Sequence, residues 1–403
     1  MGGLVVKYLI LLLAGCELFV DVPNATLATK DASGDGRGVC IDASTCTAPT
    51  PQCDTTSHTC VECLSSPDCV TPDRPVCQAE ACRGCLDDTE CPASNVCLSD
   101  GSCADPARVL YAAQTGTGVA CTQAAPCTFD QAVASVSATA DVVKLAPGTY
   151  DRPAQLAITK NMIVTGEGAT FHGTATTSFT LMFDITSAAV TFLRIHFDLG
   201  GMFGAECGMN GELHLDRVVI TNGVAGAYSS ACTFSVDRSL IDSVTFYGLY
   251  LINSTVTVSN TFVTNSGASS QGGIVINGSS GVIEHVTLAG DTAAMAGGQA
   301  IRCTDGNVAI RSSIIFGNGT PAVEDACLVG HSVIDPGYAG PGTDNVTMDP
   351  LYVAPATRDY HIQAGSPAVG LADPASHQTD DYDGDPRPNP AGSMADSGAD
   401  EIP

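Results

Sequence analysis

The sequence predicts an all-β protein built as a parallel β-helix, or solenoid, in which short strands stack into coils. Two observations support this prediction: apolar segments recur every 21 to 27 residues, and Asn or Gly turns follow several of them. The composition agrees, with 42 Gly, 5% aromatic residues and no Trp. Small aliphatic and β-branched side chains fill stacked coils more readily than one large globular core.

Six apolar segments carry the repeat. Their leading residues are 23, 21, 22, 25 and 27 positions apart, the range of one coil of a β-solenoid. A coil is not stable alone, because its apolar row is buried only between neighbouring coils. We therefore expect roughly eight or nine coils between residues 140 and 335, with caps at the ends. The segments are residues 192–197, 215–220, 236–241, 258–263, 283–288 and 310–315.

The first fifteen residues predict export. Lys7 precedes a short apolar run at residues 8–13, and small residues follow it. This pattern describes a secretory signal peptide over residues 1–15. The apolar run is shorter than the roughly 20 residues that a membrane-spanning helix needs.

Cys16 ends a segment, residues 13–16, that resembles a bacterial lipobox. The resemblance implies that the Cys16 thiol is lipidated and anchors the chain to a membrane; the alternative is an ordinary signal peptide with an incidental cysteine. Glu17, and not Asp, follows the cysteine, which resembles the sequence pattern of lipoproteins sorted to the outer membrane. We therefore expect a lipid-anchored protein of the outer membrane or cell surface. Residues 16–39 lack apolar periodicity and are interpreted as the lipidated tether.

Twelve cysteines within residues 40–103 form three units of four. Each unit begins Cys-x5-Cys, and each junction between units is Cys-x2-Cys. The junctions also match a zinc-site spacing, but zinc would leave Cys69 and Cys77 without a role, and an exported segment is oxidised. Disulfides within each unit are favoured, with their connectivity open. The segment resembles the Cys-rich repeats that precede larger domains in surface lipoproteins of predatory and social deltaproteobacteria, and it is interpreted as a stalk.

A short helix is predicted where the β-helix begins. Thr128 and Gln131 form a capping box, and the apolar residues that follow share one helical face. The predicted helix spans residues 129–136 and caps the first coil. Its apolar face consists of Phe129, Ala132, Val133 and Val136.

The two ends of this region resemble one family. A strand, a cysteine loop, the helix and the segment LAPGTY at 145–150 resemble the opening of right-handed parallel β-helix proteins of the pectin-lyase-like superfamily. The tail resembles the C-terminal signature of bacterial surface members, except that Ser397 stands at a usual Ile, which we expect to weaken the final packing. We place the β-helix at 104–350 and a C-terminal cap at 351–403. The tail motifs are residues 349–353, 359–362, 365–369, 381–387 and 396–401.

Six further cysteines are expected to form three disulfides. Cys121 and Cys127 should close a local loop. The other four lie in two pairs that are about one coil apart, so each pair can bridge adjacent coils. These pairs are Cys207 with Cys232 and Cys303 with Cys327.

The clearest candidate for binding is a row of three arginines. Arg194, Arg217 and Arg238 occupy the same position in consecutive repeats, with Asp216 and Asp237 beside two of them. Stacked, they would form an outward ladder rising about 4.8 Å per coil. The ladder is either a set of surface ion pairs or an anion site for an acidic glycan or lipid phosphate.

No catalytic residue is assigned, because the carboxylate sets and motifs of the superfamily's hydrolases and lyases are missing from the sequence. No cofactor is expected apart from calcium, which Asp381, Asp383 and Asp385 would hold if they formed a loop. The formal charge of −27 excludes nucleic acid as a partner. The favoured function is a non-enzymatic surface lipoprotein, a β-helix rod for adhesion or contact with extracellular glycan. The alternative is a polysaccharide lyase or glycoside hydrolase.

Overall fold

The computed structural model describes residues 40–177, 180–267, 272–291, 299–319 and 322–402. The predicted signal peptide, Cys16 and the tether lie outside the described residues. The chain divides into two compact units. One comprises Met1–Cys69 and Cys77–Cys82, and the other Val70–Val76 and Arg83–Pro403. Among the described residues, none of the helices has both the length and the apolar character needed to cross a membrane.

The three four-cysteine units share one connectivity, in which the first cysteine pairs with the third and the second with the fourth. The predicted disulfides are confirmed, and they consume all twelve sulfurs that the zinc interpretation would need. Units this small depend on such covalent links because they bury little apolar surface. Their short elements are β1 (Gln52–Asp54), β2 (Thr59–Val61), β3 (Val76–Gln78), β4 (Ala81–Arg83), η1 (Ala43–Thr45), η2 (Ser66–Asp68) and η3 (Asp88–Glu90).

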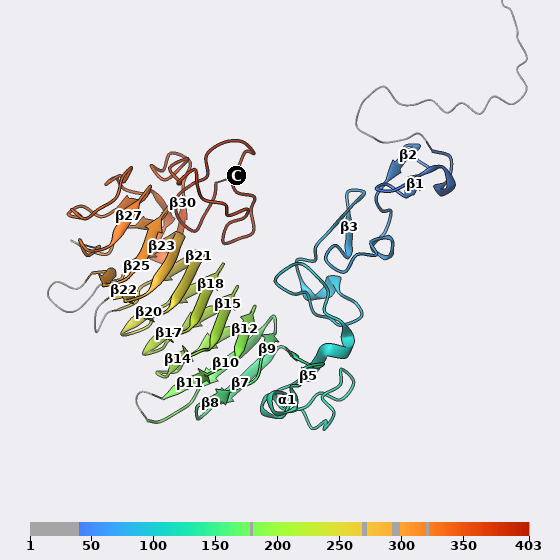
Figure 1. Ribbon diagram of the computed structural model, residues 1–403, viewed down its shortest axis with the longest axis horizontal. Coiled ribbons are helices and arrows are strands. Elements are labelled where there is room, and N and C mark those ends of the chain that lie inside the picture. Colours follow the sequence, from blue (N-terminus) through green and yellow to red (C-terminus); the bar gives the residue numbers. More distant parts are fainter. Residues whose placement is uncertain (1–39, 178–179, 268–271, 292–298, 320–321, 403) are drawn as a thin grey trace, which may run out of the picture. The chain divides into compact units, whose positions relative to one another are not determined.

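The predicted parallel β-helix is confirmed (Figure 1). One face is a seven-stranded parallel sheet to which successive coils contribute one strand each. We call this sheet the front sheet. Its strands are β8 (Leu156–Ile158), β11 (Leu181–Ile185), β14 (Phe203–Cys207), β17 (Ala225–Ser230), β20 (Tyr247–Ile252), β22 (Gly272–Asn277) and β24 (Ile301–Thr304).

The other faces form one 17-stranded sheet that bends at a corner within each coil. After η4 (Pro106–Arg108), the strands before the corner are β5 (Val109–Ala112), β6 (Val142–Leu145), β9 (Met162–Thr165), β12 (Ala189–Leu193), β15 (Glu212–Asp216), β18 (Thr233–Asp237), β25 (Asn307–Arg311) and β27 (Leu328–Gly330). Those after the corner are β7 (Gly148–Arg152), β10 (Ala169–Gly173), β13 (His196–Asp198), β16 (Val219–Thr221), β19 (Leu240–Asp242), β26 (Ile314–Ile315) and β28 (Val333–Ile334). Two longer strands, β21 (Thr255–Thr264) and β23 (Ser280–Ala289), run through the corner.

The register between coils is the predicted one. Within the described ranges, nine coils start at β6, β9, β12, β15, β18, β21, β23, β25 and β27, in agreement with the eight or nine expected. The leading residues of the six repeats pair directly with one another, and all are fully buried. In order along the solenoid they are Phe192, Leu215, Val236, Val258, Ile283 and Ile310.

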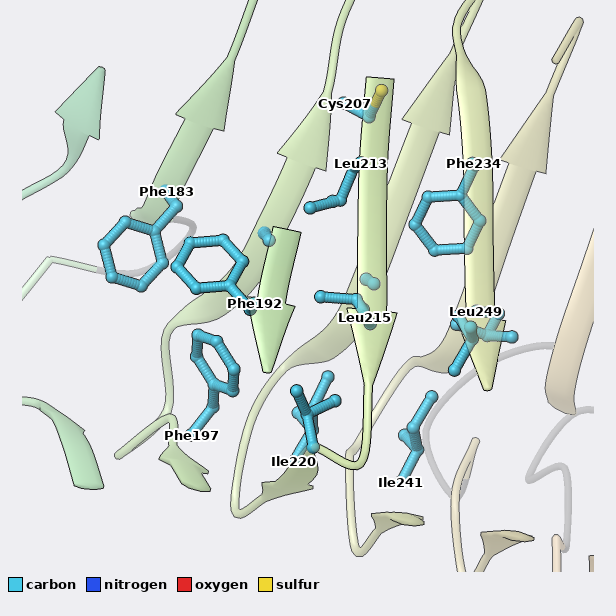
Figure 2. Close-up of a cluster of buried hydrophobic side chains, with 14 of the residues drawn as sticks. Phe183, Phe192, Phe197, Cys207, Leu213, Leu215, Ile220, Phe234, Ile241 and Leu249 are labelled. Carbon is cyan, nitrogen blue, oxygen red and sulfur yellow. The ribbon is translucent and has the colours of Figure 1, made fainter. Parts of the chain in front are cut away.

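The buried column is aromatic near its beginning and aliphatic further on (Figure 2). The ring centroids of Phe183 and Phe192 lie 5.0 Å apart, and those of Phe192 and Phe197 5.2 Å apart. In later coils Ala, Leu, Ile and Val take these places, and Phe234 is a further buried ring in the column. The stack buries apolar area in every layer, which is the main source of its stability.

Helix α1 (Phe129–Ser135) closes the first coil, as predicted. The Phe129 ring packs 4.8 Å from Phe171 in the column. The Thr128 hydroxyl accepts from the Gln131 backbone, but the reciprocal half of the capping box does not form. The Gln131 side chain donates instead to the Ser135 hydroxyl, one turn further along the helix.

Hydroxyl side chains accept hydrogen bonds from backbone N–H groups at the corners of several coils. The Val218 N–H donates to the Ser239 hydroxyl, and the Ser239 N–H donates to the Thr261 hydroxyl of the following coil. Ser313 and Ser332 repeat this arrangement. A buried N–H without a partner is costly, so these hydroxyls explain why small polar residues lie inside the solenoid.

Three disulfides lie in the β-helix unit. Cys121 bonds to Cys127 within one loop. The pairs Cys207–Cys232 and Cys303–Cys327 each join one coil to the next. All three pairs are those expected from the sequence.

The C-terminal segment packs along the corner of the later coils. After β29 (Tyr352–Ala354), η5 (Pro355–Thr357) and β30 (Asp359–Ile362), the chain returns to Ser312, whose carbonyl accepts from the Gly398 N–H. Ser397, which we expect to weaken this packing, is buried, and its hydroxyl donates to the His331 carbonyl at 2.8 Å. Arg387 and Glu401 form a fully buried ion pair beneath the segment.

The register predicts opposite outcomes for two adjacent substitutions in β21. Val258→Asp places a carboxylate in the dry column and should lower the free energy of unfolding by roughly 3 to 5 kcal/mol. Thr257→Asp changes an exposed neighbour and should cost no more than about 0.5 kcal/mol. Chemical denaturation of both variants checks the assignment, and equal stabilities would contradict it.

Candidate functional site

The three predicted arginines do align, at the corner of three successive coils. Each follows a strand of the large sheet and adopts a left-handed backbone conformation, with φ of 53° at Arg194, 52° at Arg217 and 44° at Arg238. Their side chains are only 9%, 25% and 15% exposed. The expectation of an outward, solvent-facing ladder is therefore wrong.

Carboxylates form ion pairs with the arginines at both ends of the row. Asp88, in the third four-cysteine unit, accepts from Arg194 at 3.0 Å and also pairs with Lys144. At the other end, Arg238 pairs with Asp237 at 2.9 Å and with Asp380 of the C-terminal segment at 2.8 Å.

In the coil between Arg194 and Arg238, the Arg217 Nε lies 3.4 Å from an oxygen of Asp216. A glycan carboxylate or lipid phosphate would have to displace these partners, so the structure favours the ion-pair interpretation of the row. It does not favour an anion site at Arg194, Arg217 and Arg238.

The predicted calcium set is not brought together either. Asp381 is fully buried, and one of its carboxylate oxygens accepts from the N–H groups of Asp383, Gly384 and Asp385. Its other oxygen accepts from the Glu401 N–H. Both Asp381 oxygens thus help to close a tight turn, and among the described residues Asp381, Asp383 and Asp385 form no group of donors close enough to share one ion.

The outer face of the front sheet carries an aromatic patch that the sequence analysis missed. Tyr228 and Tyr250 pair directly on adjacent strands, with ring centroids 5.3 Å apart. Tyr247 stacks on Tyr250, with ring centroids 4.7 Å apart and an angle of 19° between the ring planes. The rings border a hollow of about 340 Å³, and we call its lining the tyrosine patch: Leu181, Phe203, Glu206, Ala225, Tyr228, Tyr247 and Tyr250.

A glycine in each coil shapes this hollow. Gly204 and Gly226 approach the next coil so closely that a Cβ would lie 1.9 Å and 2.4 Å from its backbone oxygen. The strand pairing omits these positions on both partners and keeps one register on either side of them. Phe203 and Glu206, three residues apart on β14, both line the hollow.

Two carboxylates continue the tyrosine row. Asp184 pairs with Glu206, and Glu206 pairs with Tyr228, so the three side chains follow one line across adjacent strands. Asp184 accepts from Gln155 at 2.8 Å. Burial raises the pKa of Glu206, and the negative charge of Asp184 raises it further. The line therefore joins a carboxylate with a raised pKa to the tyrosine rings.

The repeat itself contained the signal for this row. Asp184, Glu206, Tyr228 and Tyr250 are each 22 residues apart, the same interval that relates the buried residues of neighbouring coils. The outer positions of the front sheet therefore repeat with the same period as its buried positions.

Comparisons with known proteins add little about activity. No family model and no curated protein sequence matches this chain. Among solved structures, the chain is similar to "pectate lyase Pel9A", with a TM-score of 0.42 and 15% identity over 73% of this chain and 96% of that one. Likeness at this level carries no argument about the reaction, so the site must be judged by its own residues.

The ion pairs at the arginine row lead to a stability prediction. Asp88→Asn leaves the charges of Lys144 and Arg194 buried without a counter-charge, and should cost roughly 3 to 5 kcal/mol. Asp141→Asn breaks the more exposed pair with Arg108 and should cost less than about 1 kcal/mol. Denaturation of the two variants side by side measures the difference, and an Asp88→Asn variant as stable as wild type would contradict the role of Asp88 as the counter-charge of Lys144 and Arg194.

Proposed function

We propose that this chain is a non-enzymatic surface lipoprotein whose β-helix binds a glycan through the tyrosine patch. The observation that carries the proposal is a set of three tyrosines beside two carboxylates on the front sheet. Tyr247 stacks on Tyr250, Tyr228 makes a tilted contact with Tyr250, and all three line the hollow. Flat aromatic faces pack against the C–H faces of sugar rings, and phenol groups add hydrogen bonds at the rim. Carboxylates accept hydrogen bonds from sugar hydroxyls.

The electrostatics favour a neutral or amino-sugar glycan. The chain has 43 acidic and 16 basic residues, and Asp184 and Glu206 add negative charge at the patch itself. An acidic polysaccharide would be repelled there. This differs from the acidic ligand that an open arginine row would have bound.

The proposal places the chain at the outer membrane or cell surface. Its support is the lipobox-like segment ending at Cys16 and the nine disulfides of the described residues, which suit an oxidising compartment. The membrane is then a partner through the lipid anchor.

Glycoside hydrolysis is the second candidate function. One observation favours it: Asp184 and Glu206 lie on adjacent strands, which are about 4.8 Å apart. Retaining glycosidases hold their two carboxyl groups at about 5 to 5.5 Å, with one protonated as the acid. In this mechanism Glu206, with its raised pKa, would protonate the leaving oxygen, and Asp184 would attack the sugar carbon.

Binding and turnover can be tested in one set of assays. On a glycan array, the purified chain should retain neutral or amino-sugar oligosaccharides with little dependence on salt. Tyr250→Ala should weaken binding roughly 2- to 10-fold, because stacking on a ring contributes about 0.5 to 1.5 kcal/mol. Arg217→Ala is the matched control and should bind as wild type does. Loss of binding in the arginine variant alone would contradict the site.

The same oligosaccharides should remain uncleaved when products are followed by mass spectrometry. Turnover that disappears in Glu206→Gln, with binding retained, would replace the first proposal by the second.

The anchor has its own test. Cys16→Ser should abolish incorporation of labelled fatty acid into the expressed chain, because the serine hydroxyl cannot form the thioether that lipidation requires. Cys303→Ser, which removes a disulfide cysteine instead, is the control and should be labelled normally. Labelling of the Cys16→Ser variant at the wild-type level would contradict the anchor.

A further inference from the structure

A second group of chemically active side chains lies in the C-terminal cap, apart from the tyrosine patch. It consists of His361 on β30, Asp383 in the turn closed by Asp381, and Asp400 close to the end of the chain. One donor atom from each lies within 4.8 Å of the other two. Three other groups of this kind occur among the described residues, and all three are cysteines that form disulfides.

The imidazole of His361 is oriented by a fourth side chain. Its Nδ1 lies 2.6 Å from an oxygen of Asp359, and its Nε2 lies 3.0 Å from an oxygen of Asp383. In the absence of a metal ion, the two ring N–H groups donate to Asp359 and Asp383, and a bound ion would replace the Nε2 proton and take the lone pair of that nitrogen. Histidine ligands of metal ions are commonly held in this way, by a carboxylate on the other ring nitrogen.

The backbone fixes the two carboxylates. Three N–H groups converge on Asp381 and hold the turn that carries Asp383. One oxygen of Asp400 accepts from the Ile362 N–H at 2.7 Å, which leaves the other oxygen for a ligand. On one side the group is bordered by the Phe262 ring, 5.3 Å from the His361 ring. The donors are therefore positioned before any ion arrives.

We propose that His361, Asp383 and Asp400 bind a divalent transition-metal ion of the zinc type, with Asp359 as the positioning residue. One nitrogen and two carboxylate oxygens suit zinc, whose tetrahedral ligands are about 3.3 Å apart. Here His361 Nε2 and Asp383 Oδ2 are 3.0 Å apart, and all three donors lie within 4.8 Å of one another. Calcium prefers six or more oxygens and is disfavoured by the imidazole. The Asp383 side chain is 49% exposed, so a water can complete the coordination.

The ion would neutralise a concentration of negative charge and join three parts of the cap. Asp359, Asp383 and Asp400 are three carboxylates around one imidazole. A bound dication links β30, the Asp381 turn and the chain end, and it stabilises the folded state because the unfolded chain lacks the assembled site. This proposal does not depend on the glycan site.

Metal titration of the intact chain tests the site. The chain, with its disulfides oxidised, is freed of metal by a chelator and titrated with ZnCl₂ by calorimetry, and with Co²⁺ by absorption spectroscopy. Wild type should bind one equivalent and melt at a higher temperature with zinc. His361→Ala and Asp383→Asn should each bind at least about tenfold more weakly, and Asp359→Asn roughly 10- to 100-fold more weakly.

The control is His214→Ala, because His214 lies 2.9 Å from the carboxylate of Glu212 but belongs to no group of three ligands. It should bind zinc as wild type does. Asp383→Asn alters an exposed side chain, and circular dichroism verifies that the variant is folded. No saturable binding by wild type, or equal binding by His361→Ala, would overturn the proposal and leave His361 as a partner in ion pairs only.

Discussion

Parallel backbone pairing between successive coils is the interaction on which the rest of this structure depends. Each coil repeats the backbone path of the one before it, so a residue is placed directly above its equivalent about 22 positions earlier. One register thereby aligns the buried column, the corner hydroxyls and the outer rows. Because strands lie about 4.8 Å apart, any favourable or unfavourable contact in one coil is repeated in the next.

The corner arginines illustrate how this repetition constrains charge. Three guanidinium groups stacked at strand spacing repel one another unless anions lie between them. Asp216 and Asp237 supply part of that charge from within the coils. Asp88 and Asp380 supply the remainder from segments on either side of the β-helix in sequence. The arginine row thus holds the third cysteine unit and the C-terminal segment against the solenoid.

The periodic part of the fold could be read from the sequence, and the rest only in part. Six equivalent apolar residues, from Phe192 to Ile310, fixed the coil and its register. Cysteine spacing predicted the three disulfides of the β-helix unit, but not the pairing in the four-cysteine units. The row from Asp184 to Tyr250 follows the same period and was detectable. His361, Asp383 and Asp400 follow no period, because the path of the cap alone brings them together.

Cross-linking along the outer row tests the shared register most directly. Glu206 and Tyr228 are direct neighbours, whereas Glu206 and Tyr250 are two coils, or about 9.6 Å, apart. A disulfide needs Cα atoms closer than about 7 Å. The double variant Glu206→Cys/Tyr228→Cys should therefore oxidise to an additional disulfide, seen as a cross-linked peptide by mass spectrometry, while Glu206→Cys/Tyr250→Cys keeps two thiols that can be alkylated. Free thiols in the first variant, or a cross-link in the second, would contradict the account.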